Sequence, residues 1–239
     1  MTIQFTKLKQ CNVMTSDISI GHVSDLLIEE DVWIVRYLVV DLISILPNRQ
    51  FLISPQAIRH FDFSNNRLLT NLASNQVLKS DPDNQHESIS RRHEKALVEY
   101  YGWPLYWLGR AAQFSPQSLE KMAKDDIREN IDDHSSSRLR SAIEMCGYRL
   151  RATDEPAGLI HDFNIDEDSW KLKSLISAED SWKSNQTFVA STDQIHEVNW
   201  SNRAINLLVH KAILETSGDH SNSARIAGEV SSSQPDSYQ

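Results

Sequence analysis

The sequence predicts an all-β protein with a helical linker, built from two copies of one small β module. Three observations predict this fold: a repeat at a constant offset, an apolar period close to two inside each copy, and a middle segment of helix-forming composition. We expect a first module over residues 1–80, a partly helical linker over 81–137, a second module over 138–215 and a disordered tail over 216–239.

An internal repeat is the dominant feature of the sequence. Residues 20–33 align with residues 157–170 at a constant offset of 137. Seven aligned positions are identical or nearly so and carry glycine, a β-branched residue, aspartate, isoleucine, glutamate, aspartate and tryptophan. The same offset pairs Asn48 with Asn185, Phe51 with Phe188, Ser54 with Ser191 and Ile58 with Ile195. The match therefore extends over a whole module.

Each copy is expected to begin with a β-hairpin, because its apolar residues alternate before and after an acidic turn. In the first strand, Val23, Asp25 and Leu27 are expected to share one face. Tryptophan is expected to open the second strand, as Trp33 in the first copy and Trp170 in the second.

The later strands follow the same pattern in both copies. The strand at 33–40 is apolar on both faces and is expected to lie centrally, whereas its counterpart at 170–176 is amphipathic. We further expect a third strand at 51–53 and 188–190, a short helical or 3₁₀ turn after it, and a fourth strand that starts at Asp62 and Asn199. Short strands at this spacing favour a small barrel or a closed sandwich.

The linker combines predicted helices with a cluster of rings. Helices are expected over about 90–101 and from Ser115 to about Asn130. Between them lies the aromatic segment, which consists of Tyr100, Tyr101, Trp103, Tyr106 and Trp107. These rings are candidate anchors of a protein interface, and they are equally suited to clamping the two modules together. Stacking on single-stranded nucleic acid is disfavoured, because residues 81–145 contain 12 acidic against 9 basic residues.

The repeated polar residues have structural interpretations. Gly21 and Gly158 are expected to supply a bulge or a close backbone approach, and Asp25 and Asp162 to accept hydrogen bonds. The acidic runs at 29–31 and 166–168 carry oxygen ligands for a hard cation, but adjacent acids without a sharp glycine are more typical of a soluble turn.

Composition excludes several classes of protein. Two cysteines, Cys11 and Cys146, exclude a disulfide-rich scaffold, favour a reducing cytoplasm and are expected to be small buried apolar residues. The longest apolar run, 33–46, contains two charged residues, and residues 1–10 lack an apolar core, so we expect neither membrane insertion nor a signal peptide. A net charge of -9 disfavours binding to a phosphate backbone.

No constellation of residues predicts catalysis. None of the nine histidines recurs at the repeat offset, and the sequence contains neither a glycine-rich phosphate loop nor a nucleophile elbow. We therefore expect no catalytic, cofactor-binding or metal-binding residues.

The pattern Gly-x-Val-x-Asp-(Leu/Phe)-x-Ile-(acid)-Glu-Asp-x-Trp, followed by Phe-(Leu/Val)-x-Ser, resembles that of tandem PRC-barrel proteins in both copies. This family shares its barrel with the cytoplasmic domain of the photosynthetic reaction centre H subunit and with the C-terminal domain of ribosome-maturation factors. The segment 101–107 is similar to the linker of stand-alone bacterial members with two barrels. The resemblance implies two PRC-type β-barrels in tandem that act as an interaction module without known chemistry.

The chain also departs from the family. Asp41 and Ile45 correspond to Ala178 and Trp182, so the two copies are not expected to bind the same partner. Residues 1–239 show no counterpart of the H subunit's membrane helix or of the N-terminal barrel of ribosome-maturation factors, so we expect neither role for the chain.

Residues and resemblance together predict a cytoplasmic, non-catalytic interaction or assembly module whose partner is an unidentified protein or a second copy of the chain. One alternative is a protein that senses a small molecule or a metal ion. Another is an accessory factor of a photosynthetic or other membrane electron-transfer complex, an interpretation that rests on fold analogy alone.

Overall fold

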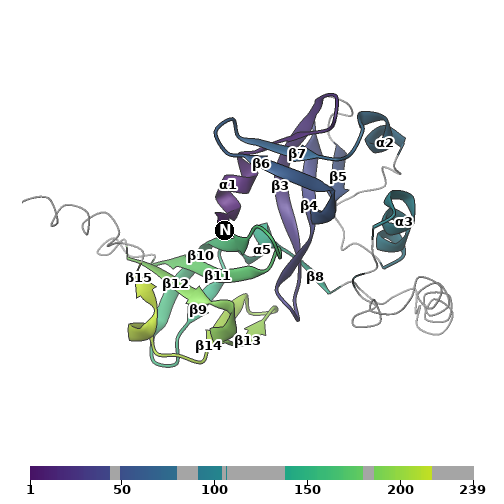
Figure 1. The fold of residues 1–239 in the computed structure, drawn as a ribbon. Coiled ribbons are helices and arrows are strands. Elements are labelled where there is room, and N and C mark those ends of the chain that lie inside the picture. The colour runs from purple at the N-terminus through teal and green to yellow at the C-terminus, as the bar shows by residue number, and fades with distance from the viewer. Residues whose placement is uncertain (44–48, 80–90, 104–105, 107–137, 180–185, 217–239) are drawn as a thin grey trace, which may run out of the picture. The chain divides into compact units, whose positions relative to one another are not determined.

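The computed structural model describes residues 1–43, 49–79, 91–103, 106, 138–179 and 186–216. This part of the chain is mostly β, as the sequence predicts, and forms two separate mixed sheets (Figure 1). It divides into a first unit, 1–143 with 166–171, and a second unit, 144–165 with 172–239. Neither sheet closes on itself through hydrogen bonds between the described strands, so closed barrels are not observed. The expected helix after Ser115 and nearly all of the expected tail lie outside the described residues.

The first unit contains a seven-stranded sheet in the order β5-β4-β3-β2-β7-β6, with β8 paired to β3. Only β2 and β7 pair in parallel. The elements of this unit are β1 (Thr2–Gln4), α1 (Phe5–Lys9), β2 (Asn12–Met14), β3 (Ser19–Glu29), β4 (Ile34–Leu42), β5 (Arg49–Ile53), η1 (Pro55–Ala57), β6 (Ile58–Asp62), β7 (Arg67–Thr70), α2 (Ser74–Lys79), α3 (Arg91–Tyr101) and β8 (Leu139–Ser141).

The second unit repeats this arrangement in the order β13-β14-β9-β10-β11-β12-β15. The parallel pair is again formed by the equivalent strands, here β9 and β14. The elements are α5 (Ala142–Met145), at the division between the units, and then β9 (Arg149–Arg151), β10 (Pro156–Asp166), β11 (Leu172–Ala178), β12 (Thr187–Ser191), η3 (Thr192–Gln194), β13 (Ile195–Asn199), β14 (Ala204–Leu207), η4 (Lys211–Ile213) and β15 (Glu215–Thr216).

The offset of 137 recurs in the backbone of the two units. The strands β3 and β10, β6 and β13, and β7 and β14 begin and end at residues exchanged by this offset. Unusual dihedral angles repeat as well, since Trp33 and Trp170 have φ of 58° and 57°, and Asn66 and Arg203 both have φ of 50°. The repeated sequence therefore folds along a repeated path, including its least common backbone conformations.

Gly21 and Gly158 mark a close approach of neighbouring strands. A Cβ atom at Gly21 would lie 1.8 Å from the carbonyl oxygen of Asp41, and one at Gly158 would lie 2.1 Å from that of Ala178. Gly158 also has a φ of 90°, a conformation that side chains disfavour. Only glycine fits at these two equivalent positions.

The expected alternation along the first strand is wrong. The pairing of β3 with β4 shifts register between Val23 and Asp25, as at a β-bulge, so Leu26 and Ile28 continue the buried face that Val23 begins. Asp25 and Leu27 therefore do not share that face. The pairing of β10 with β11 shifts at the equivalent place. A bulge cannot be read from an apolar pattern alone, because one extra residue inverts the alternation after it.

Two expected strand starts are also wrong. Trp33 and Trp170 end the hairpin turns, and the second strands begin after them. Asp62 and Asn199 end β6 and β13, and the final strands start only beyond the next turns.

Each unit has an apolar core. Leu26, Leu38 and Leu68 are fully buried in the first unit, as are Phe163 and Leu175 in the second. Burial of a side chain of this size stabilises a fold by about 1.5 to 3 kcal/mol. Of the helices that the structure describes, none has both the length and the apolar character needed to cross a membrane.

Candidate functional site

Part of the aromatic segment covers an apolar cluster on the first sheet. Tyr37, Val39 and Leu52 are buried there although they lie outside the main core, and Leu97 of α3 packs on them. Three members of the aromatic segment, Tyr101, Trp103 and Tyr106, complete this cluster. We call Tyr37, Tyr101, Trp103 and Tyr106 the aromatic face. It explains why β4, an interior strand between β5 and β3, is apolar on both sides.

The rings of the aromatic face contact one another closely. Tyr101 and Trp103 stack with centroids 4.5 Å apart, and Tyr37 lies 6.5 Å from Trp103 and 6.4 Å from Tyr106. Tyr100 is 48% exposed but borders this cluster, because its ring meets that of Tyr101 edge-on with centroids 4.7 Å apart. Trp107 lies outside the described residues. Tyr101, Trp103 and Tyr106 of the aromatic segment thus pack on the first unit's own sheet.

Polar contacts fix two members of the cluster. The Tyr106 hydroxyl donates a hydrogen bond of 2.5 Å to Oε1 of Glu94, whose side chain is fully buried. The Arg36 guanidinium lies 4.3 Å from the centroid of the Tyr106 ring, and its Nη2 lies 2.6 Å from Glu29. A charged group that leaves water needs such partners, so these contacts hold the rings in place.

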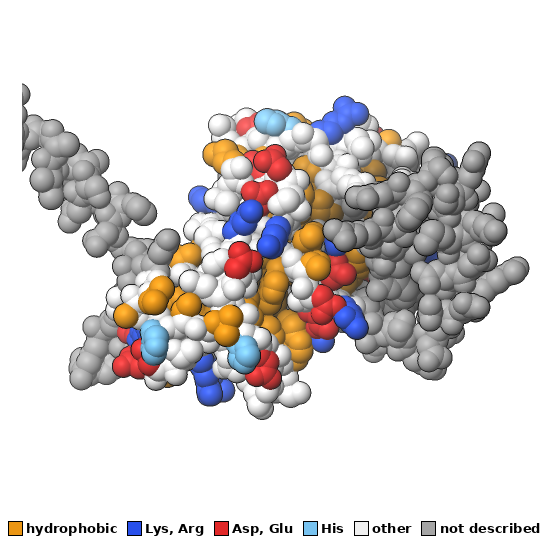
Figure 2. Space-filling model, turned by 60° about the horizontal axis from the view of Figure 1, so that its bottom comes forward, with side chains coloured by type: hydrophobic (Ala, Val, Ile, Leu, Met, Phe, Trp, Pro, Cys, Tyr) orange, Lys and Arg blue, Asp and Glu red, His pale blue; other side chains and the backbone are white. Residues whose placement is uncertain are grey.

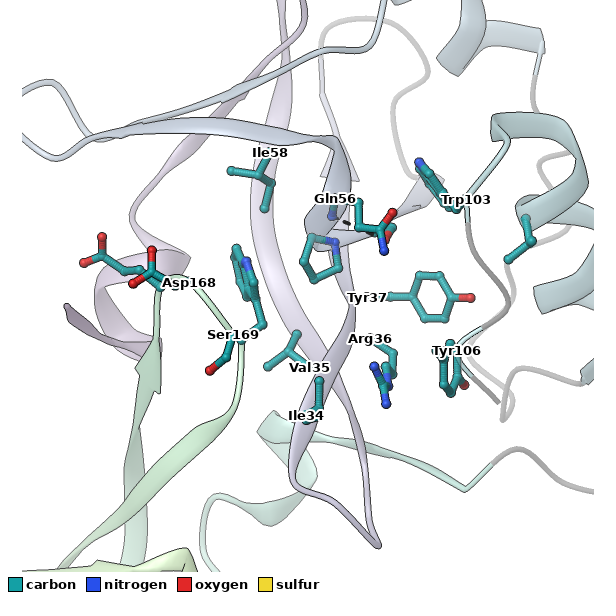
Figure 3. A pocket seen from close by; sticks show the side chains of 15 residues that line it. Ile34, Val35, Arg36, Tyr37, Gln56, Ile58, Trp103, Tyr106, Asp168 and Ser169 are labelled. Atoms are coloured by element: carbon teal, nitrogen blue, oxygen red, sulfur yellow. Dashed lines mark hydrogen bonds between the residues drawn. The ribbon is translucent and has the colours of Figure 1, made fainter. Parts of the chain in front are cut away.

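A pocket with a volume of about 420 Å³ adjoins the aromatic face (Figure 3). Tyr37, Trp103 and Tyr106 line one end, and the turn at 167–170 lines the other. The remaining lining residues come from β4, α3 and the segment around η1; they are Ile34, Val35, Arg36, Ser54, Pro55, Gln56, Ile58 and Val98. We call this pocket the aromatic groove.

The turn at 166–171 belongs to the first unit through several contacts. The backbone N–H of Val35 donates to the carbonyl of Trp170 at 2.9 Å, and Ile34 forms a β-bridge with Lys171. The Trp170 ring is 8% exposed and lies 5.7 Å from that of Phe61. The tryptophan that the repeat singled out therefore forms part of the groove wall.

One buried acceptor in the groove has no partner. Among the described residues, Oε1 of Glu167 is the one buried side-chain nitrogen or oxygen that makes no hydrogen bond. Such atoms are uncommon in folded proteins and call for an explanation. The sequence did not single out this glutamate from its acidic neighbours, because only the folded chain shows which carboxylates are paired.

The acidic turn at 29–31 is neutralised by arginines. Arg36 pairs with Glu29, Arg140 Nε lies 2.7 Å from Glu30, and Arg138 pairs with Asp31. Within the part of the chain that the structure describes, no group of three His, Cys, Asp or Glu side chains could hold a metal ion.

The repeated aspartates accept hydrogen bonds. Asp25 receives the Ser141 hydroxyl and the backbone N–H groups of Leu26 and Ile143, the latter at 3.0 Å. Burial nevertheless raises the pKa of the Asp25 carboxyl, and these hydrogen bonds oppose the rise. Asp162 is 4% exposed and accepts the N–H of Phe163 at 2.8 Å.

The equivalent surfaces of the two copies differ at Asp41. Its Oδ1 accepts a hydrogen bond from Ser24 at 2.8 Å and another from Gln50 at 2.9 Å, and so ties β4 to both neighbouring strands. Alanine 178 occupies the equivalent position and has no such group.

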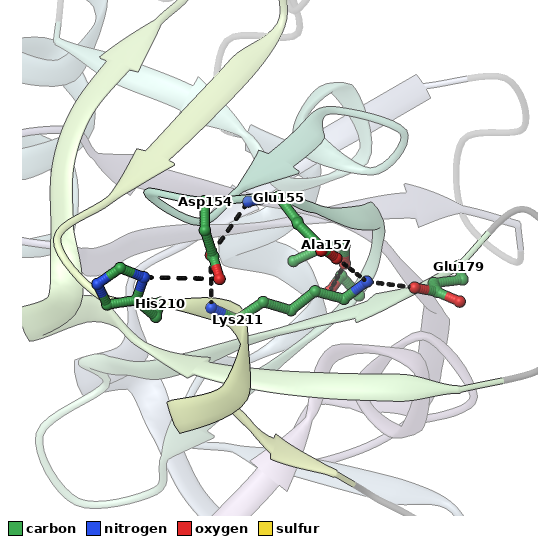
Figure 4. A network of polar contacts seen from close by, with 7 residues as sticks. Asp154, Glu155, Ala157, Glu179, His210 and Lys211 are labelled. Carbon is green, nitrogen blue, oxygen red and sulfur yellow. Dashed lines mark hydrogen bonds and ion pairs between the residues drawn. The ribbon is translucent and has the colours of Figure 1, made fainter.

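The second unit contains a polar network that the sequence did not predict (Figure 4). Lys211 forms ion pairs with Glu179 and, at 3.7 Å, with Glu155, and its backbone N–H donates to Asp154. His210 lies 3.5 Å from Asp154. The hydrogen bond to Glu179 raises the pKa of Lys211, which keeps the amine protonated. This network holds the end of the sheet and presents no nucleophile.

The two cysteines differ in burial. Both are free, but Cys11 is buried as the sequence predicts, whereas Cys146 is only partly buried, which corrects that expectation. Burial raises the pKa of the Cys11 thiol, which makes it less reactive. On the face in Figure 2, acidic and basic side chains of the described residues are interspersed, unlike the basic stripe of a nucleic-acid-binding protein. Neither a protein-family model nor a curated protein matches the chain in sequence.

Proposed function

We propose that this chain is a non-catalytic protein-interaction module built from two PRC-barrel-like copies, and that it binds its partner at the aromatic groove. The observation that carries this proposal is the gathering of Tyr37, Trp103, Tyr106 and Trp170 with Arg36 around one open pocket. Trp, Tyr and Arg are the residues that most often dominate the free energy of protein association. The repeated backbone path supports the duplication on which the family resemblance is based.

Several side chains that line the groove are held in place by contacts within the chain. The Tyr106 hydroxyl is held by Glu94, and Arg36 is held between Glu29 and the Tyr106 ring. Side chains that are fixed before association lose little conformational entropy when a partner binds. Because Arg36 and Tyr106 already bind Glu29 and Glu94, we infer that they form a rigid surface and do not transfer protons.

Affinity capture with the full chain tests this proposal. Gln56 lines the groove with an exposed side chain, so Gln56→Lys should reduce capture of the partner about tenfold without unfolding the protein. Gln10→Lys is the matched control, because Gln10 is exposed and is not among the groove residues. Equal capture by both variants and the unchanged chain would contradict the proposal.

The pocket volume favours a second candidate, a small-molecule sensor, since about 420 Å³ falls in the range of ligand sites. A thermal-shift panel of metabolites tests it, because a ligand that binds the native state raises the melting temperature. If the chain is a sensor, a metabolite should raise the melting temperature of the unchanged chain and of Gln10→Lys, but not that of Gln56→Lys. A metal-ion sensor has less support, since the acidic residues at 29–31, which could have bound a cation, are paired with arginines.

A further inference from the structure

We infer that Glu167, at the turn end of the aromatic groove, binds the guanidinium group of an arginine side chain from the partner protein. This inference rests on the proposed function and names the chemistry of the partner.

The unpaired oxygen of Glu167 points to a ligand that donates hydrogen bonds. Its Oε1 is buried without a partner, although the backbone N–H of the same residue donates to the Met1 carbonyl at 2.9 Å and so fixes the turn. Rotation about the last side-chain bond is soft in glutamate, so this oxygen can turn toward the groove. A donor that enters the groove would remove the cost of the unsatisfied carboxylate.

The first copy shows which donor fits a glutamate at this place in the turn. Glu30 is the repeat equivalent of Glu167, and its Oε2 is paired with Arg140 Nε at 2.7 Å. The residue equivalent to Arg140 is Ile3, so the sequence that supplies an arginine to one turn supplies none to the other. A guanidinium from outside the chain would restore the missing pair.

The rest of the groove suits such a side chain. Arg36 stacks on Tyr106 at 4.3 Å, which shows that the groove's rings accept a guanidinium on their faces. Glu29 pairs with Arg36, and Asp168 of the turn lies 3.9 Å from the exposed Met1 amine. The unpaired oxygen of Glu167 is therefore the acceptor that remains at the turn end of the groove, and the groove walls favour apolar residues beside the arginine.

Calorimetric titration of the full chain tests the inference with acetyl-Leu-Arg-Leu-amide as the probe. We expect saturable binding that weakens at least about tenfold when citrulline replaces arginine and when Glu167→Gln replaces the acceptor. Glu30→Gln is the matched control and should bind the peptide as the unchanged chain does. Arginine amide alone should bind about tenfold more weakly than the peptide, because it lacks the apolar neighbours.

The inference is overturned if the peptide shows no saturable binding at millimolar concentration. It is also overturned if the citrulline peptide binds as tightly as the arginine peptide, or if the Glu167→Gln variant binds the arginine peptide as tightly as the unchanged chain does. Melting temperatures within a few degrees of the unchanged chain establish that the variants are folded. Affinity capture with Glu167→Gln separates the two proposals. Capture lost in Gln56→Lys but kept in Glu167→Gln contradicts only the arginine site, whereas capture kept in Gln56→Lys contradicts the proposed function.

Discussion

The two copies share a backbone path but differ on their outer faces. In the first copy, Tyr37 and Val39 lie under α3 and the aromatic segment. In the second, Ser174 stands at the place of Tyr37, and its hydroxyl accepts a hydrogen bond from Asn164 at 2.9 Å. The duplicated part is thus the scaffold of glycine, bulge and turn, while the aromatic face, which forms one end of the groove, packs on the first copy only.

The largest loss of stability is expected from substitution of the two equivalent glycines, Gly21 and Gly158. Gly21→Ala and Gly158→Ala should each reduce the free energy of unfolding by about 3 kcal/mol, because the new methyl group meets a carbonyl oxygen. Gly158→Ala should cost about 1 kcal/mol more because of its positive φ. Urea unfolding followed by circular dichroism measures both values.

Gly147→Ala is the control for the glycine variants. Gly147 has a φ of 92° but open space around it, so its substitution should cost only about 1 kcal/mol. Similar losses at all three glycines would mean that backbone conformation, and not the close strand approach, requires glycine.

The next effect compares two tyrosines of the aromatic segment. Tyr106→Phe removes the donor to the buried Glu94 and should cost about 2 kcal/mol in unfolding free energy. Tyr100→Phe removes an exposed contact to the Gln76 carbonyl at 3.3 Å and should cost less than about 0.5 kcal/mol. If both variants unfold alike, Tyr106 does not anchor the aromatic face.

A smaller difference in stability is expected between equivalent substitutions in the two acidic turns. Glu30→Gln breaks a partly exposed pair with Arg140 and should destabilise the chain by about 0.5 kcal/mol. Glu167→Gln removes the charge of a carboxylate with an unpaired oxygen and should be neutral or slightly stabilising. Thermal unfolding of the two variants at one protein concentration gives the comparison. A larger loss in Glu167→Gln would show that this oxygen is already paired within the chain.

Two aspartates of the first unit should respond to pH in opposite directions. Burial raises the pKa of Asp25 above 3.8, so its favourable contribution exists below that pH and is lost as pH rises through the folded value. Hydrogen bonds from Ser74 and Thr15 lower the pKa of Asp17 to about 2, so its contribution exists above pH 3.8 and is lost as pH falls toward 2. Stability measured from pH 3 to 7 should therefore rise with pH in Asp25→Asn relative to the unchanged chain, and fall in Asp17→Asn. Parallel curves for the two variants would contradict this assignment.

The sequence predicts the scaffold better than the site. Gly21, Asp25 and Trp33 recur at a fixed offset, so duplication, hairpins and strand order within a hairpin follow from local pattern. The register shift after Val23 does not, because it depends on pairing with β4. The groove depends on contacts between distant residues, such as Val35 with Trp170, and no local period encodes these.

Photo-crosslinking at equivalent positions of the two copies tests the central claim most directly. A benzophenone amino acid replaces either Gln56 in the groove or Asp193, its exposed equivalent in the second copy. If the aromatic groove binds the partner, a covalent adduct with the partner forms from position 56 and not from position 193. Adducts of equal yield from both positions, or from position 193 alone, would contradict the account.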